Sequence, residues 1–143
     1  MGNSLSDYIN RRDSLQERIA KLNQNNAQLQ REIEILEKAE RKLKPLVDKA
    51  NNIKERVKKD NCTKGYAWRG QYKKKYDELF EKEIKKDAKS FADSIKNMYN
   101  KVSATLRSRK TQLKTGRSDL STYINQRTVL QGKINDMAGG GFR

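Results

Sequence analysis

The sequence predicts an all-α fold, a long antiparallel two-helix hairpin of the coiled-coil type, from three observations. Apolar residues recur every seven positions through most of the chain. Pro45 is the only proline among 143 residues, so long helices are sterically permitted. The apolar period stops between Asp60 and Ala67, which places the turn near residues 60–67. Because this connector is short, the two helices should run antiparallel and cover each other.

The first helix is expected at about residues 5–59, where one leucine ladder continues without a break. Its members are Tyr8, Leu15, Leu22, Leu29, Leu36, Leu43, Ala50 and Val57. They occupy d positions of a heptad repeat, and Ile19, Ile33 and Val47 occupy a positions. Asn26 also falls on an a position, where its need for a polar partner would fix the register. The ladder continues past Pro45, so we expect a kink there and not a helix end.

The second helix is expected at about residues 68–137, where the seven-residue period returns. Its main ladder holds Tyr99, Leu106, Leu113, Leu120 and Ile134. Three glycines follow, and glycine favours helix ends over helix interiors. We therefore expect one helical-hairpin domain over residues 1–138 and a flexible glycine-rich tail over residues 139–143.

A short element near the start of the chain is repeated near its end. The spacing Tyr-Ile-Asn-x-Arg-x-x-Leu-Gln begins at Tyr8 and begins again at Tyr123. Heptads explain the shared apolar residues but not the shared Asn, Arg and Gln. Two interpretations stay open, a chance match and a pseudo-symmetric contact surface beside the termini.

The apolar face is narrow near the termini and broadens toward the turn. A two-helix seam needs only a narrow stripe, whereas a wide stripe is typical of helices that pack against further helices. A better-packed hairpin end or a homodimer would also explain the width. We expect partner docking, because two helices alone bury little surface. The residues expected to bind the partner are Tyr72, Tyr76, Leu79, Phe80, Ile84, Phe91, Ile95, Leu46 and Ile53.

The composition argues against catalysis and against membrane insertion. The chain has no histidine and one cysteine, Cys62, so it lacks the residues for a structural zinc site or a histidine acid–base pair. We expect no catalytic residues, no metal and no cofactor. No stretch approaches the roughly 20 apolar residues of a membrane-spanning helix. The N-terminus has no signal-peptide pattern, so we expect the chain in the cytoplasm before any export, and export would use a route that does not read such a signal.

The bend carries the tripeptide Trp68-Arg69-Gly70, and Phe80 follows soon after it. Trp68 can cover the open end of the hairpin, and Gly70 permits close approach of another chain. This motif, between two long amphipathic helices, resembles the W-x-G helical-hairpin proteins of type VII secretion. Over nearly the whole chain the resemblance is strongest to the accessory proteins of LXG-type toxins.

The resemblance implies a non-enzymatic accessory or targeting protein. Its implied partners are the helical N-terminal domain of an LXG-type toxin, a second small helical accessory protein and the secretion machinery. Such substrates often carry an aromatic residue followed four positions later by an acid. Here Tyr123 is followed at that spacing by the basic residue Arg127. Three alternatives stay open: the chain leaves with its toxin, it uses a composite signal, or it stays inside as a targeting factor.

The formal net charge of +15 leaves two alternatives to this interpretation. A basic helical protein could bind nucleic acid by neutralising phosphates. However, the basic residues are spread over both predicted helices and form no known groove-reading motif, so nucleic acid is not the expected partner. A homodimeric coiled-coil scaffold built on the first helix is the other alternative, and it would leave the second helix uncovered.

Overall fold

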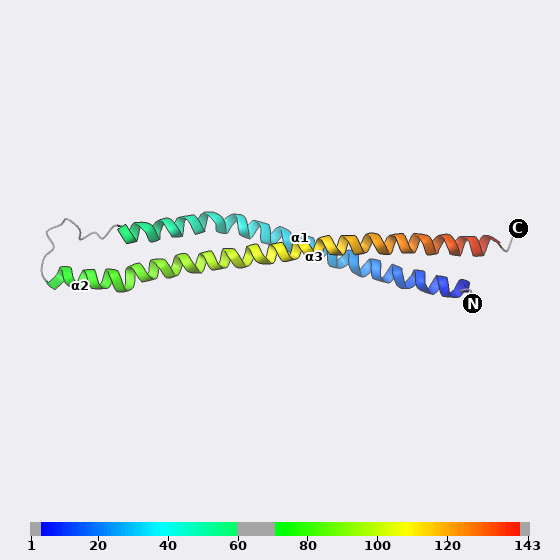
Figure 1. Cartoon of the computed structure of the whole chain (residues 1–143), viewed down its shortest axis with the longest axis horizontal. Coiled ribbons are helices and arrows are strands. Elements are labelled where there is room, and N and C mark those ends of the chain that lie inside the picture. The colour runs from blue at the N-terminus through cyan, green and yellow to red at the C-terminus, as the bar shows by residue number, and fades with distance from the viewer. Residues whose placement is uncertain (1–3, 60–70, 141–143) are drawn as a thin grey trace. The chain divides into compact units, whose positions relative to one another are not determined.

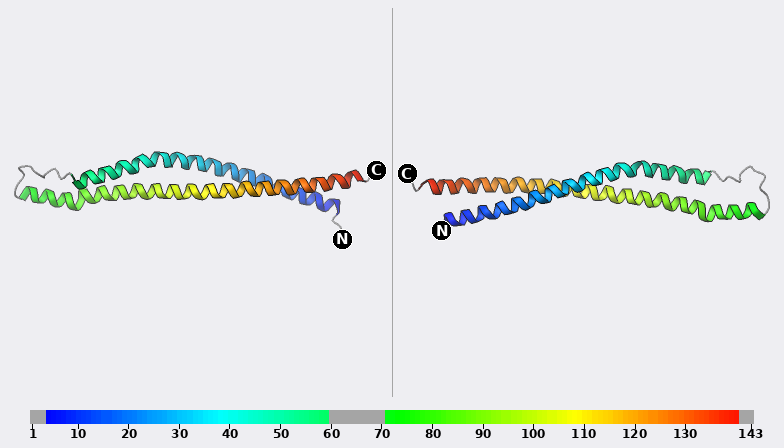
Figure 2. Two further views of the ribbon diagram at one scale, coloured as in Figure 1. Left: turned by 45° about the horizontal axis from the view of Figure 1, so that its top comes forward. Right: turned by 180° about the vertical axis from the view of Figure 1, so that it is seen from behind.

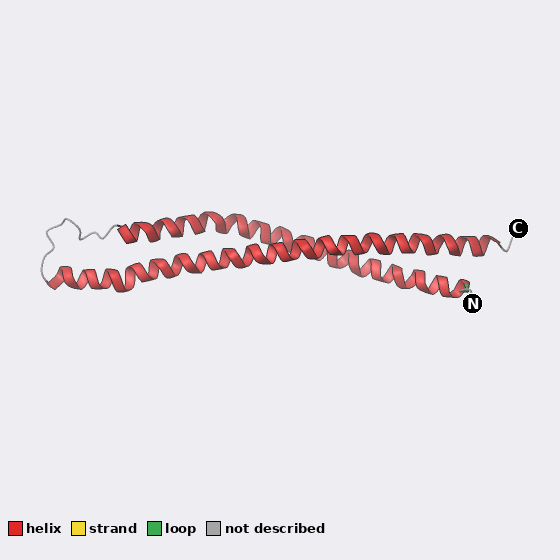
Figure 3. Cartoon of the chain, in the orientation of Figure 1, coloured by secondary structure: helices red, strands yellow, loops and turns green. Residues whose placement is uncertain are grey.

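The computed structural model describes residues 4–59 and 71–140, and all of these from Leu5 onward are helical. Helix α1 spans Leu5–Lys59 and helix α2 spans Gln71–Leu79. A π-helical turn, η1, spans Phe80–Ile84 and leads directly into helix α3 at Lys85–Gly140. The described ranges contain no strand, which confirms the predicted all-α class (Figures 1 and 3).

The chain divides into two compact units, each built from a segment of α1 and a segment of the second helical stretch. The terminal unit comprises Met1–Glu34 and Arg107–Arg143, and the central unit comprises Ile35–Leu106. Within each unit the α1 segment lies beside the α3 segment in all the views of Figures 1 and 2. This pairing agrees with a helical hairpin.

In the terminal unit the two segments run antiparallel. Arg12 donates a hydrogen bond to Gln131 at 3.2 Å, and Arg117 donates one to Gln30 at 3.2 Å. Residues late in α3 therefore pair with residues early in α1, and earlier α3 residues pair with later α1 residues. The buried residues of this seam come from the predicted ladders and are Leu15, Ile19, Ile33, Leu113 and Ile134.

The start of α1 is capped by a reciprocal pair of hydrogen bonds. The Asp7 backbone N–H donates to Ser4 Oγ, and the Ser4 backbone N–H donates to Asp7 Oδ2, both at 3.2 Å. This is a capping box, which satisfies two backbone donors at the helix start.

The central unit continues the same ladders. Its buried apolar residues are Ala50, Phe80, Ala92 and Leu106. Ser103 Oγ donates to Glu40 Oε2 at 2.8 Å and joins α3 to α1. Pro45 lies inside α1, so the helix continues through it as expected.

The π-helical turn η1 corrects the phase of the apolar ladder. Counting seven residues back from Ala88, which is half-buried, would bring Glu81 to the seam. A π turn holds one residue more than an α turn, so it shifts the upstream face by one position. The structure accordingly buries Phe80 to 4% exposure and leaves Glu81 exposed. The Lys85 backbone N–H donates to the Phe80 carbonyl and closes the turn.

The C-terminal end differs from the expectation. Helix α3 continues past Met137 through Gly139 to Gly140, which the sequence analysis assigned to a flexible tail. Glycine lowers helix stability by about 1 kcal/mol relative to alanine but does not forbid the helical conformation. Residues 141–143 lie outside the described ranges.

Candidate protein-binding surfaces

The central unit exposes three large apolar residues on α1, namely Ile35, Leu46 and Ile53, and the last two belong to one row. The side chains of Leu46 and Ile53 are seven residues apart and are 44% and 49% exposed. Residues at this spacing lie on one face of a helix. Leu46 directly precedes Val47, a half-buried residue at an a position. Both exposed side chains therefore stand beside the seam, on one side of it.

The second helical stretch of the central unit exposes a matching row. Ile84, Phe91 and Met98 follow one another at intervals of seven and are 37%, 53% and 54% exposed. Each directly precedes a position of the main ladder, at Lys85, Ala92 or Tyr99. In an antiparallel pair, the residues that precede the a positions on both helices flank the same side of the seam. We call Leu46, Ile53, Ile84, Phe91 and Met98 together the central apolar face.

The predicted partner-binding residues fall into three groups. Those that are exposed are Leu46, Ile53, Leu79, Ile84 and Phe91. Phe80 is buried, while Tyr76 and Ile95 are half-buried, so these three serve packing within the unit. The side chain of Tyr72, and the motif residues Trp68 and Gly70, lie outside what the structure describes.

Aromatic packing around η1 explains the burial of Phe80. The rings of Tyr76 and Phe80 stack with centroids 6.2 Å apart. The Lys85 ammonium lies 5.6 Å from the centroid of the Phe80 ring and forms an ion pair with Glu81 at 2.7 Å.

Met98 was absent from the predicted partner-binding set, although its position seven residues after Phe91 indicates the same face.

In the terminal unit the repeated sequence element forms a pseudo-two-fold arrangement. The Lys133 ammonium lies 5.6 Å from the centroid of the Tyr8 ring, and the Arg18 guanidinium lies 6.0 Å from that of Tyr123. Tyr8 and Tyr123 are equivalent in the two copies, and so are the basic residues Arg18 and Lys133. Each copy therefore places a cation over the tyrosine of the other. Equivalent residues Ile19 and Ile134 are both buried.

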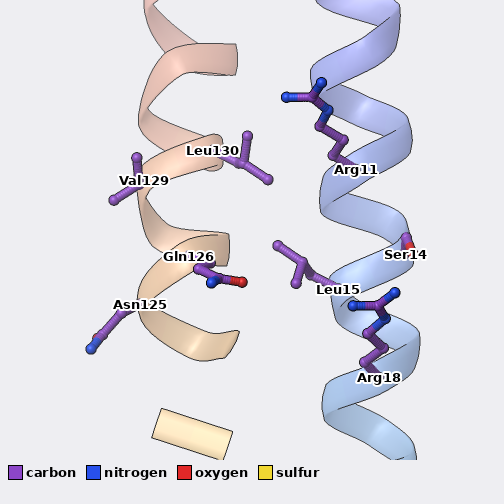
Figure 4. Close-up of a pocket in the computed structure, with 8 residues that line it drawn as sticks. All are labelled: Arg11, Ser14, Leu15, Arg18, Asn125, Gln126, Val129 and Leu130. Atoms are coloured by element: carbon purple, nitrogen blue, oxygen red, sulfur yellow. The ribbon is translucent and has the colours of Figure 1, made fainter. Parts of the chain in front are cut away.

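A groove lies across this pseudo-symmetric element, between the α1 and α3 segments of the terminal unit (Figure 4). Its volume is about 510 Å³. The lining residues are Arg11, Ser14, Leu15, Arg18, Asn125, Gln126, Val129 and Leu130. We call it the arginine groove.

The seam of the terminal unit also contains one polar layer. A Cβ atom added at Gly116 would collide with the Asn26 side chain, so the two residues face each other across the seam. Both side-chain amide atoms of Asn26 are buried and have no hydrogen-bond partner among the described residues. Gly116 thus provides the space that the Asn26 side chain occupies.

The described residues contain neither a metal-binding cluster nor a membrane-spanning helix. Residues 4–59 and 71–140 contain no group of three or more His, Cys, Asp or Glu side chains placed to hold a metal ion. No helix in these ranges is long and apolar enough to cross a membrane. No family model, curated protein or solved structure matches the chain significantly.

Proposed function

We propose that this chain is a non-enzymatic accessory protein that binds the helical N-terminal domain of an LXG-type toxin and promotes its export by type VII secretion. The observation that carries the proposal is the central apolar face. The resemblance of Trp68-Arg69-Gly70 and its flanking helices to the W-x-G proteins supplies the identity of the partner.

The central apolar face has the form expected of a helix-docking surface. Its five side chains are roughly half exposed and lie in two parallel rows, one on each helix. Burying such a half-exposed side chain contributes roughly 1 kcal/mol, so five of them contribute roughly 5 kcal/mol before the entropy lost on association. Two helices with one apolar side gain most by packing against further helices, which suits a helical partner domain.

The charge of the chain favours an acidic partner over a second copy. With a net charge of +15, two copies repel each other, whereas an acidic helical domain is attracted and its encounter accelerated. A homodimer is the main competing use of the same face.

The test is co-purification of the full chain with the N-terminal domain of an LXG-type toxin encoded beside it. Phe91→Asp and Ile53→Asp place a carboxylate on the central apolar face and should abolish the complex. Ser90→Asp and Asn52→Asp add the same charge at the neighbouring exposed positions, off that face, and should leave the complex intact. Circular dichroism of each variant verifies that helicity is retained.

Two outcomes would contradict the proposal. One is equal loss of binding in both pairs of variants, since docking would then not depend on the central apolar face. The other is a stable homodimer of the wild-type chain that Phe91→Asp disrupts, measured by light scattering without partner. That result would assign the face to self-association.

A further inference from the structure

The arginine groove of the terminal unit has no role in the function proposed above, and it has its own chemistry. We propose that it is a second docking site, which takes an acidic amphipathic helix of another protein with carboxylates seven residues apart along one edge.

The floor of the groove is apolar. Leu15 from α1 and Leu130 from α3 point toward each other in Figure 4. Leu15 is buried at 9% exposure, whereas Val129, which also lines the groove, is 59% exposed. An apolar side chain entering from outside would cover Val129 and extend the seam. This matches the apolar stripe of an amphipathic helix, with contacts at intervals of three and four residues.

One rim of the groove carries the positive charge. Arg11 and Arg18 are both exposed and lie seven residues apart on α1, a separation of about 10.5 Å along the helix axis. A docked helix with acidic residues at the same spacing would meet both guanidinium groups. Arginine suits this contact because its planar donors bind a carboxylate in bidentate fashion. The contact of Arg18 with the Tyr123 ring restrains one of the two side chains beforehand.

The opposite rim is neutral, and this asymmetry sets how a helix would lie. Under the pseudo-two-fold relation, the counterpart of Arg11 in the second copy is the uncharged Gln126. Lys133, the counterpart of Arg18, lies over the Tyr8 ring and is not among the residues that line the groove. Asn125 and Gln126 line that rim with amides. The docked helix should therefore direct its acidic edge toward α1 and an uncharged polar edge toward α3.

The charge of the groove also decides what kind of occupant it takes. A second copy would bring a net charge of +15 to a rim that is already positive. A purely apolar helix would gain nothing from either arginine. An acidic amphipathic helix can pack its apolar stripe on the floor and pair its carboxylates with the two arginines of the rim.

The test uses the full chain and a synthetic helical probe, with binding measured by fluorescence anisotropy. The probe is an amphipathic peptide of about 20 residues, long enough to be helical, with a leucine stripe and glutamates seven residues apart along one edge. A second peptide is identical except that lysines replace these glutamates. The wild-type chain should bind the glutamate peptide and bind the lysine peptide at least about tenfold more weakly.

Charge reversal should exchange this preference. The double variant Arg11→Glu, Arg18→Glu should lose about tenfold or more in affinity for the glutamate peptide and gain affinity for the lysine peptide. The matched control is Arg107→Glu, Lys114→Glu, an exposed basic pair with the same spacing on α3, away from the groove. This control changes the net charge by the same amount as the groove variant. It should change the affinity for each peptide only through the overall charge of the chain, and by less than the groove variant does.

The proposal would be overturned by three results. The wild-type chain could fail to prefer the glutamate peptide, the two double variants could behave alike, or the groove variant could abolish self-association of the chain. If the glutamate peptide binds in the arginine groove and not on the central apolar face, the Phe91→Asp variant should bind it as wild type does. Failure here is thus separate from failure of the toxin complex.

Discussion

Asn26 and Gly116 form a layer of the terminal unit in which the glycine, having no side chain, leaves room for the asparagine. The sequence predicts the a position of Asn26 and its need for a polar partner. The structure places a glycine opposite it and leaves both buried amide atoms without a hydrogen bond among the described residues. A buried amide without a partner destabilises a fold by about 1–3 kcal/mol. Such a layer costs stability but disfavours other registers, where Asn26 would meet a larger residue.

Gly116→Ala should lower the free energy of unfolding although alanine is the better helix former. The added Cβ collides with the Asn26 side chain, and relief requires that side chain or the helices to move. Gly132→Ala is the control, because a Cβ there meets nothing within 4 Å. That variant should be more stable than wild type by about 0.5–1 kcal/mol. Chemical denaturation of both variants measures the difference.

The double variant Asn26→Ala, Gly116→Ala identifies the cause. With the amide removed, the second alanine has room, so the double variant should be more stable than Gly116→Ala alone. If Gly116→Ala were instead as stabilising as Gly132→Ala, the close contact with Asn26 would have no energetic weight.

At the scale of the helices, the sequence predicts most of the structure because the seven-residue period fixes both ladders. α1 spans Leu5–Lys59, the range expected, and the buried apolar residues of both units lie on the predicted ladders except Phe80. The π turn was not predicted, since one extra residue in a turn leaves no composition signal. Its trace in the sequence is a phase slip: Phe80 lies eight residues before Ala88 and not seven.

Deletion of Lys82 should test this phase argument. The deletion places Phe80 seven residues before Ala88, so an ordinary α-helix then brings Phe80 to the seam without the π turn. Because the π turn has poorer hydrogen bonding, the deletion should keep or raise the thermal midpoint. Deletion of Asn97, an exposed residue of regular α3, is the control and should lower the midpoint, since it moves the upstream ladder off the seam.

Thermal unfolding followed by circular dichroism distinguishes the two deletions. Phe80→Ala calibrates the scale, because removal of a buried phenylalanine costs about 3–5 kcal/mol. A Lys82 deletion as damaging as the Asn97 deletion would show that η1 does something other than restore the phase.

The candidate surfaces were predicted less completely than the helices. The sequence indicates the broad apolar face, because Leu46, Ile53, Ile84 and Phe91 can be counted on the repeat. The sequence does not tell which large apolar residues are buried between the two helices, and Phe80 is one of them. The arginine groove was not predicted as a site, although a contact surface beside the termini was one of the two interpretations left open for the repeated element. Its two rims come from segments more than 100 residues apart and meet only through the antiparallel register.

For the whole molecule, the two surfaces belong to different compact units, so they should act as separate binding modules. The central apolar face lies within Ile35–Leu106, and the arginine groove lies within Met1–Glu34 and Arg107–Arg143. Mutations at distant sites with no shared partners have additive effects on free energy, within about 0.5 kcal/mol. Phe91→Asp and the Arg11→Glu, Arg18→Glu pair share no contact in either unit. Combined in one chain, their effects on unfolding free energy should therefore add.

Binding at the two surfaces should depend differently on salt concentration. Affinity of the wild-type chain for the glutamate peptide rests partly on exposed charges, which salt screens over a Debye length of about 8 Å at physiological ionic strength. Capture of the toxin domain through the central apolar face rests on apolar burial, so its dissociation rate should change little with salt. Titration of both interactions from low to high sodium chloride, by anisotropy and by surface plasmon resonance, compares them directly. Equal salt slopes would mean that one electrostatic surface serves both ligands, which contradicts the division into two modules.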